Sequence, residues 1–293
     1  MPEESVALAA IRWFDANARD LPWRHPDAGA WAILVSEVML QQTPVVRVLP
    51  AYEAWLARWP TPAALAADEP GEAIRMWGRL GYPRRALRLH ECATAIAQRH
   101  DGVVPDDLDQ LLALPGVGAY TARAVTAFAY GQRQPVVDTN VRRFVARAVT
   151  GLADGGHTTR PADLVETAAL LPDEPAVAAR ASAAFMELGA VVCVARSPRC
   201  TICPLVDRCA WRAAGRPALD GPSRRPQTYA GTDRQVRGLL LAVLREAVEP
   251  VPRVRLDVVW PDPTQRDRAL RGLIDDGLVD PLPGDLFTLP TGG

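Results

Sequence analysis

The chain has 293 residues, of which 48% are hydrophobic and 23% charged, and its formal net charge is −1. This is the composition of a globular protein long enough for two domains, and no apolar run approaches the ~20 residues of a membrane span. All 33 basic residues are arginines, which excludes a Schiff base on a lysine side chain. Because the net charge is near zero, any surface that binds nucleic acid must be local. The acidic N-terminus differs from a secretory signal, so we expect a cytoplasmic protein.

Helical periodicity runs through the first two hundred residues, with almost no strand pattern. Turn residues such as proline and glycine separate the apolar-periodic segments. This part of the chain is therefore predicted to be all-α. The predicted helices span residues 5–18, 31–42, 45–59, 61–67, 70–77, 84–98, 106–112, 161–170 and 174–192, and two more begin at residue 119 and after residue 138.

One glutamate lies in an unusual place in the predicted helix 31–42. Glu37 follows Ile33 by four residues and precedes Leu40 by three, so it lies on or beside the apolar face. Burying its charge is costly, and burial should raise its pKa, which suits a general acid. The alternative is a helix-edge glutamate bonded to an arginine or a backbone group, and the pattern weighs the two equally. One turn later, Gln42 is either a surface residue or a probe that inserts into a base stack.

A turn at residues 80–85 (Leu-Gly-Tyr-Pro-Arg-Arg) opens the predicted helix 84–98. Arginines gather around Tyr82, which we expect to be exposed, and this combination suits phosphate contacts together with stacking on a base. The alternative is an ordinary solvated face. The arginines concerned are Arg75, Arg79, Arg84, Arg85 and Arg88.

Residues 114–118 (Leu-Pro-Gly-Val-Gly) join two predicted helices through a turn with two glycines. Backbone N–H groups at the start of the second helix are a natural seat for a phosphate. Twenty residues after Gly118, an apolar extended run delivers Asp138 to the start of another helix. Taken alone, these features can be an ordinary turn and a plain N-cap. Together they indicate chemistry on a nucleic-acid backbone.

Four of the five cysteines lie within seventeen residues, separated by six, two and five residues. Disulfides are rare in a reducing cytoplasm, whereas four thiolates can surround one metal centre. Zinc and an iron–sulfur cluster both accept four cysteines, and the uneven spacing favours a [4Fe–4S] cluster over a zinc ribbon. The predicted ligands are Cys193, Cys200, Cys203 and Cys209.

The loop between the first two of these cysteines carries Arg196 and Arg199. No flavin or nicotinamide fingerprint accompanies it. A cluster that pins a basic loop therefore indicates a scaffold for contacts with a phosphate backbone. The fifth cysteine, Cys92, lies within a predicted helix and is expected to be an inert packing residue.

The C-terminal part differs in pattern from the rest. Residues 215–230 are predicted to be a linker, and Thr232 to start a helix with a capping box. A helix over residues 264–276 and a hairpin at residues 278–289 follow. Residues 231–293 are thus predicted to form a small winged-helix-like domain. From residue 218 onward the chain has 10 arginines and 11 acids, which does not favour a strong grip on DNA.

The hairpin at residues 114–118, Asp138 and the cysteine spacing resemble the helix-hairpin-helix DNA glycosylases of the endonuclease III superfamily. Within it, residues 21–24 (Leu-Pro-Trp-Arg), 36–43 and 80–82 are similar to the MutY-type adenine glycosylases. The resemblance covers about residues 8–213. It implies a bilobal all-α core over residues 1–214, with the iron–sulfur loop at 193–209.

The resemblance also implies an activity and residue roles. The family removes adenine mispaired with 8-oxoguanine or guanine, after flipping it out of the duplex. Glu37 would protonate the adenine, and Asp138 would stabilise or trap the oxocarbenium ion. Asn140 would orient Asp138 or a water, and Tyr120 would lie by the sugar. The candidate DNA contacts are Gln42, Leu80, Tyr82, Arg84, Gly116, Gly118, Arg196 and Arg199, with a bound cation as a further possibility at the hairpin.

Position 120 bears on the type of glycosylase. Relatives that also cut the strand carry a lysine there, whereas this chain has Tyr120 and no lysine at all. The prediction is a monofunctional, monomeric adenine glycosylase that acts on double-stranded DNA at the nucleoid, without a membrane. Two alternatives are a thymine or uracil mismatch glycosylase and a non-catalytic iron–sulfur DNA-binding module.

Two departures from the family limit what the resemblance implies. Small residues at 181–184 replace amide or acidic side chains that help to read adenine in relatives. The tail is too short for the Nudix-type domain that recognises 8-oxoguanine in the family. It can read the opposite base in another way, bind DNA without specificity, or contact a protein partner.

Overall fold

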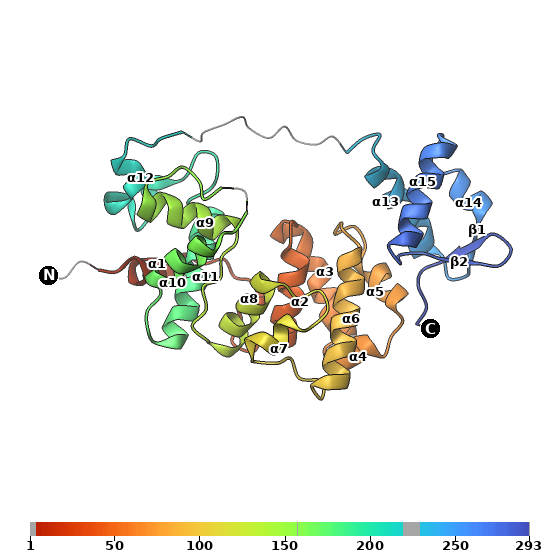
Figure 1. Cartoon of the computed structure of the whole chain (residues 1–293), viewed down its shortest axis with the longest axis horizontal. Helices are drawn as coiled ribbons and strands as arrows, with labels where there is room; N and C mark the ends of the chain where they lie inside the picture. The colour runs from red at the N-terminus through yellow and green to blue at the C-terminus, as the bar shows by residue number, and fades with distance from the viewer. Residues whose placement is uncertain (1–3, 157, 219–228, 293) are drawn as a thin grey trace. The chain divides into compact units, whose positions relative to one another are not determined.

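The computed structural model describes residues 4–156, 158–218 and 229–292, and most of the elements it contains are helices (Figure 1). The chain forms two units, each assembled from segments that are distant in sequence. Unit 1 contains the described residues of Met1–Leu34, Asp106–Leu112 and Val117–Pro222, and unit 2 contains those of Val35–Pro105, Ala113–Gly116 and Ser223–Gly293. Within the described ranges, no helix is long and apolar enough to cross a membrane.

The helices lie where the periodicity predicts them, so the all-α prediction is confirmed. Several boundaries differ from the prediction by one or two residues. The second helix, for example, ends at Leu40, because Gln42 adopts a left-handed φ of 54° that a helix cannot continue. The helices before the tail are α1 (Val6–Asn17), α2 (Ala30–Leu40), α3 (Val45–Arg58), α4 (Pro62–Ala66), α5 (Pro70–Trp77), α6 (Arg84–Arg99), α7 (Leu108–Leu112), α8 (Ala119–Tyr130), α9 (Thr139–Val145), α10 (Pro161–Leu170), α11 (Pro175–Val191) and α12 (Ala210–Ala213). Short helical turns are η1 (Pro22–Arg24), η2 (Ala146–Thr150), η3 (Cys200–Ile202) and η4 (Val206–Arg208).

The core of unit 1 forms where α1 and α9 pack against α11. Phe144 of α9 and Phe185 of α11 are both buried, with ring centroids 5.3 Å apart. A Cβ atom at Gly189 would lie 2.4 Å from the carbonyl oxygen of Asn140. Only glycine therefore lets α11 approach α9 this closely. The contact fixes the relative position of α9, which follows Asp138, and α11, which precedes Cys193.

A buried carboxylate ties the segment after α1 to α11. Glu187 is 0% exposed and accepts hydrogen bonds from Arg19 Nε (2.7 Å), Arg19 Nη2 (2.8 Å) and Arg24 Nη2 (2.8 Å). Burial would raise the pKa of Glu187, but the bonds from Arg19 and Arg24 outweigh it and lower the pKa to about 2. Arg24, the last residue of the Leu-Pro-Trp-Arg motif at residues 21–24, is thus one of the two arginines that pair with Glu187.

We expect Glu187→Gln to lower the free energy of unfolding by about 2–3 kcal/mol at neutral pH. Breaking a fully buried ion pair costs about 3–5 kcal/mol. The expected loss lies at or below the lower end of that range, because Arg19 and Arg24 stay partly solvated. A lowered folded-state pKa contributes stability above the unfolded pKa, which is lost as pH falls toward the folded value. Thermal unfolding should therefore show a constant difference between the two proteins above about pH 5. The difference should shrink as the pH falls from there toward 2; a difference independent of pH would contradict the ion-pair explanation.

Tryptophans form the centre of unit 2. Trp55 of α3 packs edge-on against Trp59 and against Trp77 of α5, with ring centroids 4.6 and 5.7 Å apart. All three side chains are at most 2% exposed. Edge-to-face packing of large rings gives favourable contacts beyond the burial of apolar area. This cluster sets the position of α5, which leads into the turn at residues 78–83.

The tail combines helices with a small sheet. The elements are α13 (Asp233–Glu246), β1 (Val251–Pro252), α14 (Arg253–Asp257), α15 (Pro263–Asp275), β2 (Asp280–Leu282) and β3 (Leu286–Thr288). The strands pair antiparallel in the order β1-β3-β2, with both Val251 and Pro281 opposite Phe287. The predicted hairpin is confirmed, and the order of helices and strands is that of a winged helix.

One local prediction in the tail is wrong. Thr232 does not cap α13 with its side chain; its hydroxyl donates to the carbonyl of Tyr229 (2.7 Å). The Gln235 side chain instead accepts from the N–H of Gly231 (2.8 Å). A competing local bond has replaced the capping box. Of the predicted linker 215–230, residues 219–228 lie outside the described residues, and the domain boundaries 1–214 and 231–293 stay predictions.

The tail packs on α5 through backbone contacts within unit 2. The N–H of Gly71 donates to the carbonyl of Pro290 (2.8 Å), and a Cβ at Gly71 would lie 2.7 Å from that oxygen. Arg245 of α13 donates to the carbonyl of Ile74 (3.0 Å), and Arg75 donates to the carbonyl of Arg245. Burial lowers the pKa of Arg245 to about 10. Arg75 therefore holds the tail and is not part of a free basic surface.

Candidate functional site

Glu37 is buried on α2, with 5% of its surface exposed. Its neighbours Ser36 and Val38 are buried as well. Glu37 therefore lies on or beside the apolar side of the helix, as the pattern predicts, and both readings of the residue stay open. The role of Glu37 as a general acid stays a prediction.

Asp138 is the N-cap of α9 and is held by its own helix. Its Oδ1 accepts from the N–H of Val141 (2.7 Å), and its Oδ2 accepts from the side chain of Asn140 (2.7 Å). Burial raises the pKa of Asp138, and the bonds from Val141 and Asn140 offset only part of that rise. Asp138 is therefore both the N-cap of α9 and the residue predicted to act as the positioned acid. Its surroundings disfavour the ionised form of the carboxyl group.

Arg143, which the sequence did not single out, connects the acid to the first cysteine. Its Nη2 donates to Asn140 Oδ1 (2.8 Å) and to the carbonyl of Gly189 (2.6 Å). Its Nε donates to the carbonyl of Cys193 (2.7 Å). The side chain is only 5% exposed, which is rare for arginine without bonded partners. A continuous chain of hydrogen bonds thus runs from Asp138 through Asn140 and Arg143 to the cysteine loop.

The four predicted cysteine ligands line one pocket of about 310 Å³, together with apolar side chains and two arginines. Nη1 of Arg147 lies 3.7 Å from Cys193 Sγ, and its guanidinium stacks 4.8 Å above the Trp211 ring. Burial raises the pKa of Cys203 to about 11 and also raises that of Cys193. Metal binding must therefore displace protons from these thiols. Four sulfur donors beside fixed positive charges fit an anionic iron–sulfur cluster.

The described residues give no sign of a site for a single metal ion. Among them, no group of three or more His, Cys, Asp or Glu is arranged to hold one. In a four-iron cluster each thiolate binds its own iron, so the four sulfurs need not converge on one point. The pocket lined by the cysteines is consistent with that arrangement.

The loop between the first two cysteines presents its arginines to solvent. Arg196 and Arg199 are both exposed, and the loop is closed by a bond from the N–H of Arg199 to the carbonyl of Val192 (2.9 Å). The nearby Arg212 instead donates to the carbonyl of Val206 (2.6 Å). Of the arginines around the cluster, the two on the loop are therefore available for a phosphate backbone.

The glycines of the hairpin have distinct reasons to be glycine. Gly116 has a φ of 75°, and a Cβ there would lie 2.7 Å from the Cβ of Arg88. Gly118 is the N-cap of α8 and has open space around it, with no side-chain cap on the first N–H groups of the helix. Tyr120, in the first turn of α8, is half-buried and packs against the small apolar cluster formed with Ala124. The turn leaves its donors open, as a phosphate seat requires.

Two exposed turns in unit 2 carry the predicted probe residues. Gln42 and Tyr82 are exposed and have left-handed φ values of 54° and 48°. Such a conformation is uncommon for residues other than glycine, and it turns both side chains out of the fold. Leu80, in contrast, is 6% exposed. The prediction that its side chain contacts DNA does not fit its position, because Leu80 packs into the interior beneath the turn.

Most arginines of the predicted basic cluster around Tyr82 have partners within the protein. Arg84 forms an ion pair with Asp276 at the end of α15 (3.2 Å), and Arg88 pairs with Glu91 (2.6 Å). Arg85 is directed into the protein. Periodicity could not reveal the partner of Arg84, because Asp276 is almost two hundred residues away in the sequence. A phosphate at Arg84 must therefore compete with Asp276 or share the arginine with it.

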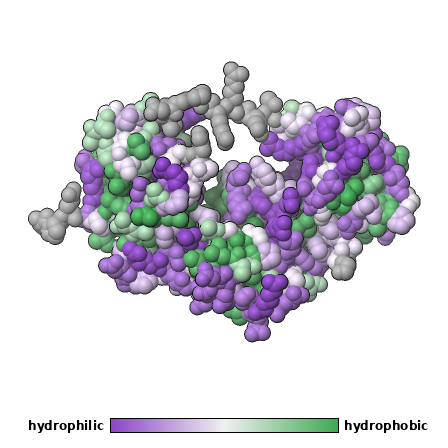
Figure 2. Space-filling model, viewed as in Figure 1, coloured by the Kyte–Doolittle hydropathy of each residue, from purple (hydrophilic) through white to green (hydrophobic). Residues whose placement is uncertain are grey.

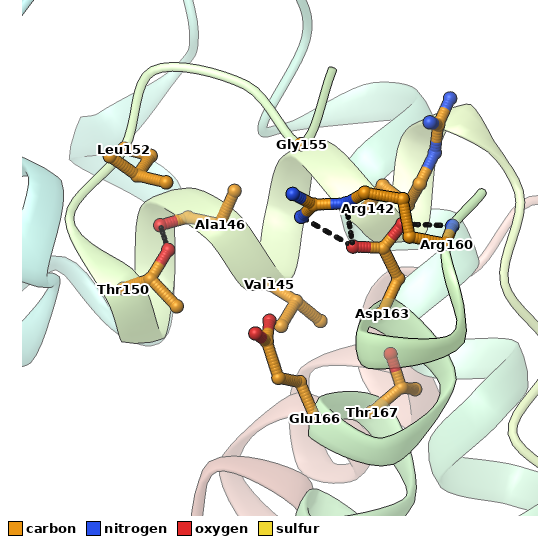
Figure 3. A pocket seen from close by; sticks show the side chains of 10 residues that line it. All are labelled: Arg142, Val145, Ala146, Thr150, Leu152, Gly155, Arg160, Asp163, Glu166 and Thr167. Atoms are coloured by element: carbon orange, nitrogen blue, oxygen red, sulfur yellow. Dashed lines mark hydrogen bonds and ion pairs between the residues drawn. The ribbon is translucent and has the colours of Figure 1, made fainter. Parts of the chain in front are cut away.

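A further pocket of about 330 Å³ lies between α9, η2 and α10 (Figure 3). Asp163 bonds to Arg160 along one side of it (2.8 Å), and the Thr167 hydroxyl is buried without a partner. The pocket contains none of the predicted catalytic residues. Sequence patterns gave no sign of it.

Comparisons with known proteins agree with this arrangement. Residues 35–160 match the model of the HhH-GPD superfamily of base excision DNA repair proteins, and residues 193–209 match the iron–sulfur binding domain of endonuclease III. The chain therefore belongs with proteins that hold a [4Fe–4S] cluster, and the choice against zinc is confirmed, while the four cysteines within the matched segment stay its predicted ligands.

Relatives match over the whole length. The adenine DNA glycosylase of Mycobacterium tuberculosis is 58% identical over 100% of this chain and 98% of its own, and that of Mycolicibacterium smegmatis is 61% identical over 95% and 94%. A solved thermostable thymine-DNA glycosylase shares 25% identity, with a TM-score of 0.63 over 71% of this chain and 95% of its own. The relative from Mycobacterium tuberculosis thus matches the whole chain, including the tail, whereas the solved structure matches 71% of it.

Proposed function

Since the chain belongs to the adenine DNA glycosylase family of base excision repair, we propose that it removes adenine paired with 8-oxoguanine or guanine. The observation that carries the proposal is the pair of buried carboxyl groups, Glu37 on α2 and Asp138 at the start of α9. Each lies in the segment where the resemblance requires it. Buried acids are common at catalytic sites, where burial tunes their protonation.

The residues act on a flipped nucleotide. Glu37 donates a proton to a nitrogen of the five-membered ring of adenine, which turns the base into a good leaving group. The bond between the sugar carbon and the base breaks, its electron pair leaves with the base, and the sugar becomes an oxocarbenium ion. The carboxylate of Asp138 stabilises this cation, and Asn140 holds the carboxylate in place. Water then adds to the sugar carbon and loses a proton to the solvent, which leaves an abasic site.

Other residues hold the duplex. Gln42 and Tyr82 insert into the base stack, and the N–H groups after Gly118 bind phosphate. Arg196 and Arg199 add positive charge on the loop that the cluster organises. The cluster itself is proposed to supply structure, since no electron acceptor is needed for hydrolysis of a glycosidic bond.

The tail is proposed to act by packing and not by gripping DNA. Several of its arginines form ion pairs within the tail: Arg268 pairs with Asp233 (2.7 Å), and Arg253 and Arg266 both pair with Asp257. Hydrophilic residues cover much of the visible face of unit 2, with apolar patches between them (Figure 2). Recognition of 8-oxoguanine is then assigned to the core turns. Any protein partner is assigned to the exposed valines of α14 and the residues beside it, Val254 and Val258.

Single-turnover base release tests the mispair specificity of this monomeric enzyme. The substrates are duplexes with one adenine opposite 8-oxoguanine, guanine, cytosine or thymine, and a thymine·guanine duplex is the control. We expect fast adenine release opposite 8-oxoguanine and guanine and no thymine release. Release opposite all four bases would refute mispair specificity. Thymine release without adenine release would favour the alternative mismatch glycosylase, for which a purine-directed acid at Glu37 has no use.

A second assay tests the monofunctional assignment. Strand cutting by a lyase proceeds through a Schiff base on an amine, and the chain offers only its N-terminus and no lysine. With Tyr120 at the position of the lysine in strand-cutting relatives, we expect intact strands with abasic sites after adenine release. Abundant cross-linked DNA after borohydride treatment would overturn this expectation.

A further inference from the structure

One arginine connects the two turns that carry the proposed DNA probes. Arg85 lies in the first turn of α6, and its Nη1 donates to the carbonyls of Val38 (2.8 Å), Met39 (3.0 Å) and Gln41 (2.7 Å). These carbonyls belong to the last turn of α2 and the residue after it. A helix C-terminus leaves such carbonyls without partners and carries partial negative charge. The guanidinium therefore caps the helix that bears Glu37.

The same guanidinium also holds the second turn. Its Nη2 donates to the carbonyl of Gly81 (3.0 Å) and to the hydroxyl of Thr43 (3.0 Å). Thr43 in turn donates to the carbonyl of Leu80 (3.3 Å). The Cζ atom of Arg85 lies 5.0 Å from the ring centroid of Trp77 and 5.7 Å from that of Tyr82. One side chain thus bonds to the residues next to Gln42 and next to Tyr82 at once.

The surroundings of Arg85 are unusual for a charged group. Among the described residues its hydrogen bonds go to backbone carbonyls and one hydroxyl, and its Nε is buried without a partner. Burial lowers the pKa of Arg85 to about 10, so it stays charged at neutral pH. Burying a charged group costs free energy, which indicates that the hydrogen bonds of Arg85 serve to position the segments that they join. The fork of an arginine can reach two separate turns, whereas the ammonium of a lysine is a single point.

We infer that Arg85 is a positioning residue that holds Gln42 and Tyr82 in one fixed spacing, so that both insert together at a mispair. The inference rests on the proposed insertion of these two side chains. Both have left-handed backbone conformations, which cost energy and persist only where the surroundings impose them. The bonds of Arg85 to the carbonyls beside them supply that constraint. Loss of the fork should let the two turns move independently while Glu37 and Asp138 stay in place.

The test is a set of single-turnover measurements with full-length protein on the adenine·8-oxoguanine duplex. Arg85→Lys keeps the charge and is expected to slow adenine release by about 10- to 100-fold, the range for a small misplacement. Arg99→Lys, at the exposed end of the same helix, is the matched control and is expected to leave the rate unchanged. Melting temperature and visible absorption of the cluster verify that each variant is folded.

A double-mutant cycle separates positioning from a merely structural role. If Arg85 acts through Tyr82, Tyr82→Ala should cost much less in Arg85→Lys protein than in the wild type. In Glu37→Gln protein, which should bind without excising, Arg85→Lys should also reduce the fluorescence rise of a 2-aminopurine next to the mispair. Additive rate losses, or an unchanged fluorescence rise, would overturn the inference.

Three failures are distinguishable. If the wild type releases no adenine from any duplex, the proposed function fails. If the wild type releases adenine but Gln42→Ala and Tyr82→Ala proteins both match its rate, the proposed insertion of these residues is refuted, and the inference is refuted with it. If Arg85→Lys does not fold, Thr43→Val removes the hydroxyl that accepts from Arg85 and donates to Leu80, and it should give a smaller loss that is again non-additive with Tyr82→Ala. An additive loss, or no loss, in that variant overturns the inference.

Discussion

Glu37→Gln protein is expected to release adenine about 1,000-fold more slowly than the wild type, within the range for loss of a general acid. Glutamine has nearly the same shape as glutamate, so the packing of the buried position on α2 should survive. Its amide cannot give up a proton at neutral pH, and neutral adenine is a poor leaving group. Single-turnover release from the adenine·8-oxoguanine duplex measures the effect.

The Glu37 experiment needs a control for binding. Since the substitution removes a proton donor and not a DNA contact, the affinity for the same duplex should change by less than about threefold, which is under 1 kcal/mol. Glu91→Gln, on the exposed side of α6, is a matched control that should leave the rate unchanged. A rate loss explained by weaker binding alone would remove Glu37 from the chemistry.

Asp138→Asn is expected to lower the rate by about 100- to 1,000-fold, as loss of a charge that stabilises the transition state does. The amide oxygen can still accept the N–H of Val141 and keep the cap of α9, because asparagine and aspartate are comparable N-caps. The charge that meets the oxocarbenium ion is lost. Asp107→Asn, whose carboxylate accepts an N–H at the exposed start of α7, is the matched control for removing an N-terminal charge.

The same substitution should raise stability. Burial raises the folded-state pKa of Asp138, so the folded protein favours the protonated form and the contribution of this group is lost as pH rises through that pKa. At neutral pH the ionised carboxylate therefore destabilises the fold, and neutral asparagine avoids this cost. The melting temperature of Asp138→Asn protein should exceed that of the wild type at pH 7, and the gain should shrink toward acidic pH. A lower melting temperature at pH 7 would contradict this account of the site.

The pH dependence of the reaction follows from the same group. Asp138 must be ionised to stabilise a cation, so wild-type activity should fall on the acid side at a pH above the ordinary range of aspartate. Arg143 holds Asn140 against this carboxylate (2.8 Å from Arg143 Nη2 to Asn140 Oδ1), so the position of the acid limb also reports on that link. An acid limb at the ordinary aspartate value would mean that Asp138 is more solvated than its surroundings indicate.

The sequence by itself determined the features that depend on local pattern. Helix positions followed from apolar spacing, because burial of one face of a helix requires it. The cysteine spacing was sufficient to predict the cluster, because four ligands close in sequence can meet without help from the rest of the fold. Asp138 and Glu37 were identifiable because each sits in a short motif. The hairpin in the tail followed from its turn residues.

Only the tertiary structure decided which charges are free. Arg84 and Leu80 were both predicted to contact DNA, but in the structure Arg84 pairs with Asp276 and Leu80 is buried. Arg85 and Arg143 were indistinguishable in sequence from surface arginines, since their partners lie 47 and 50 residues away. Hydrogen bonding between distant segments leaves no periodicity in the chain. A residue whose task is to join two segments is therefore seen only when the fold brings those segments together.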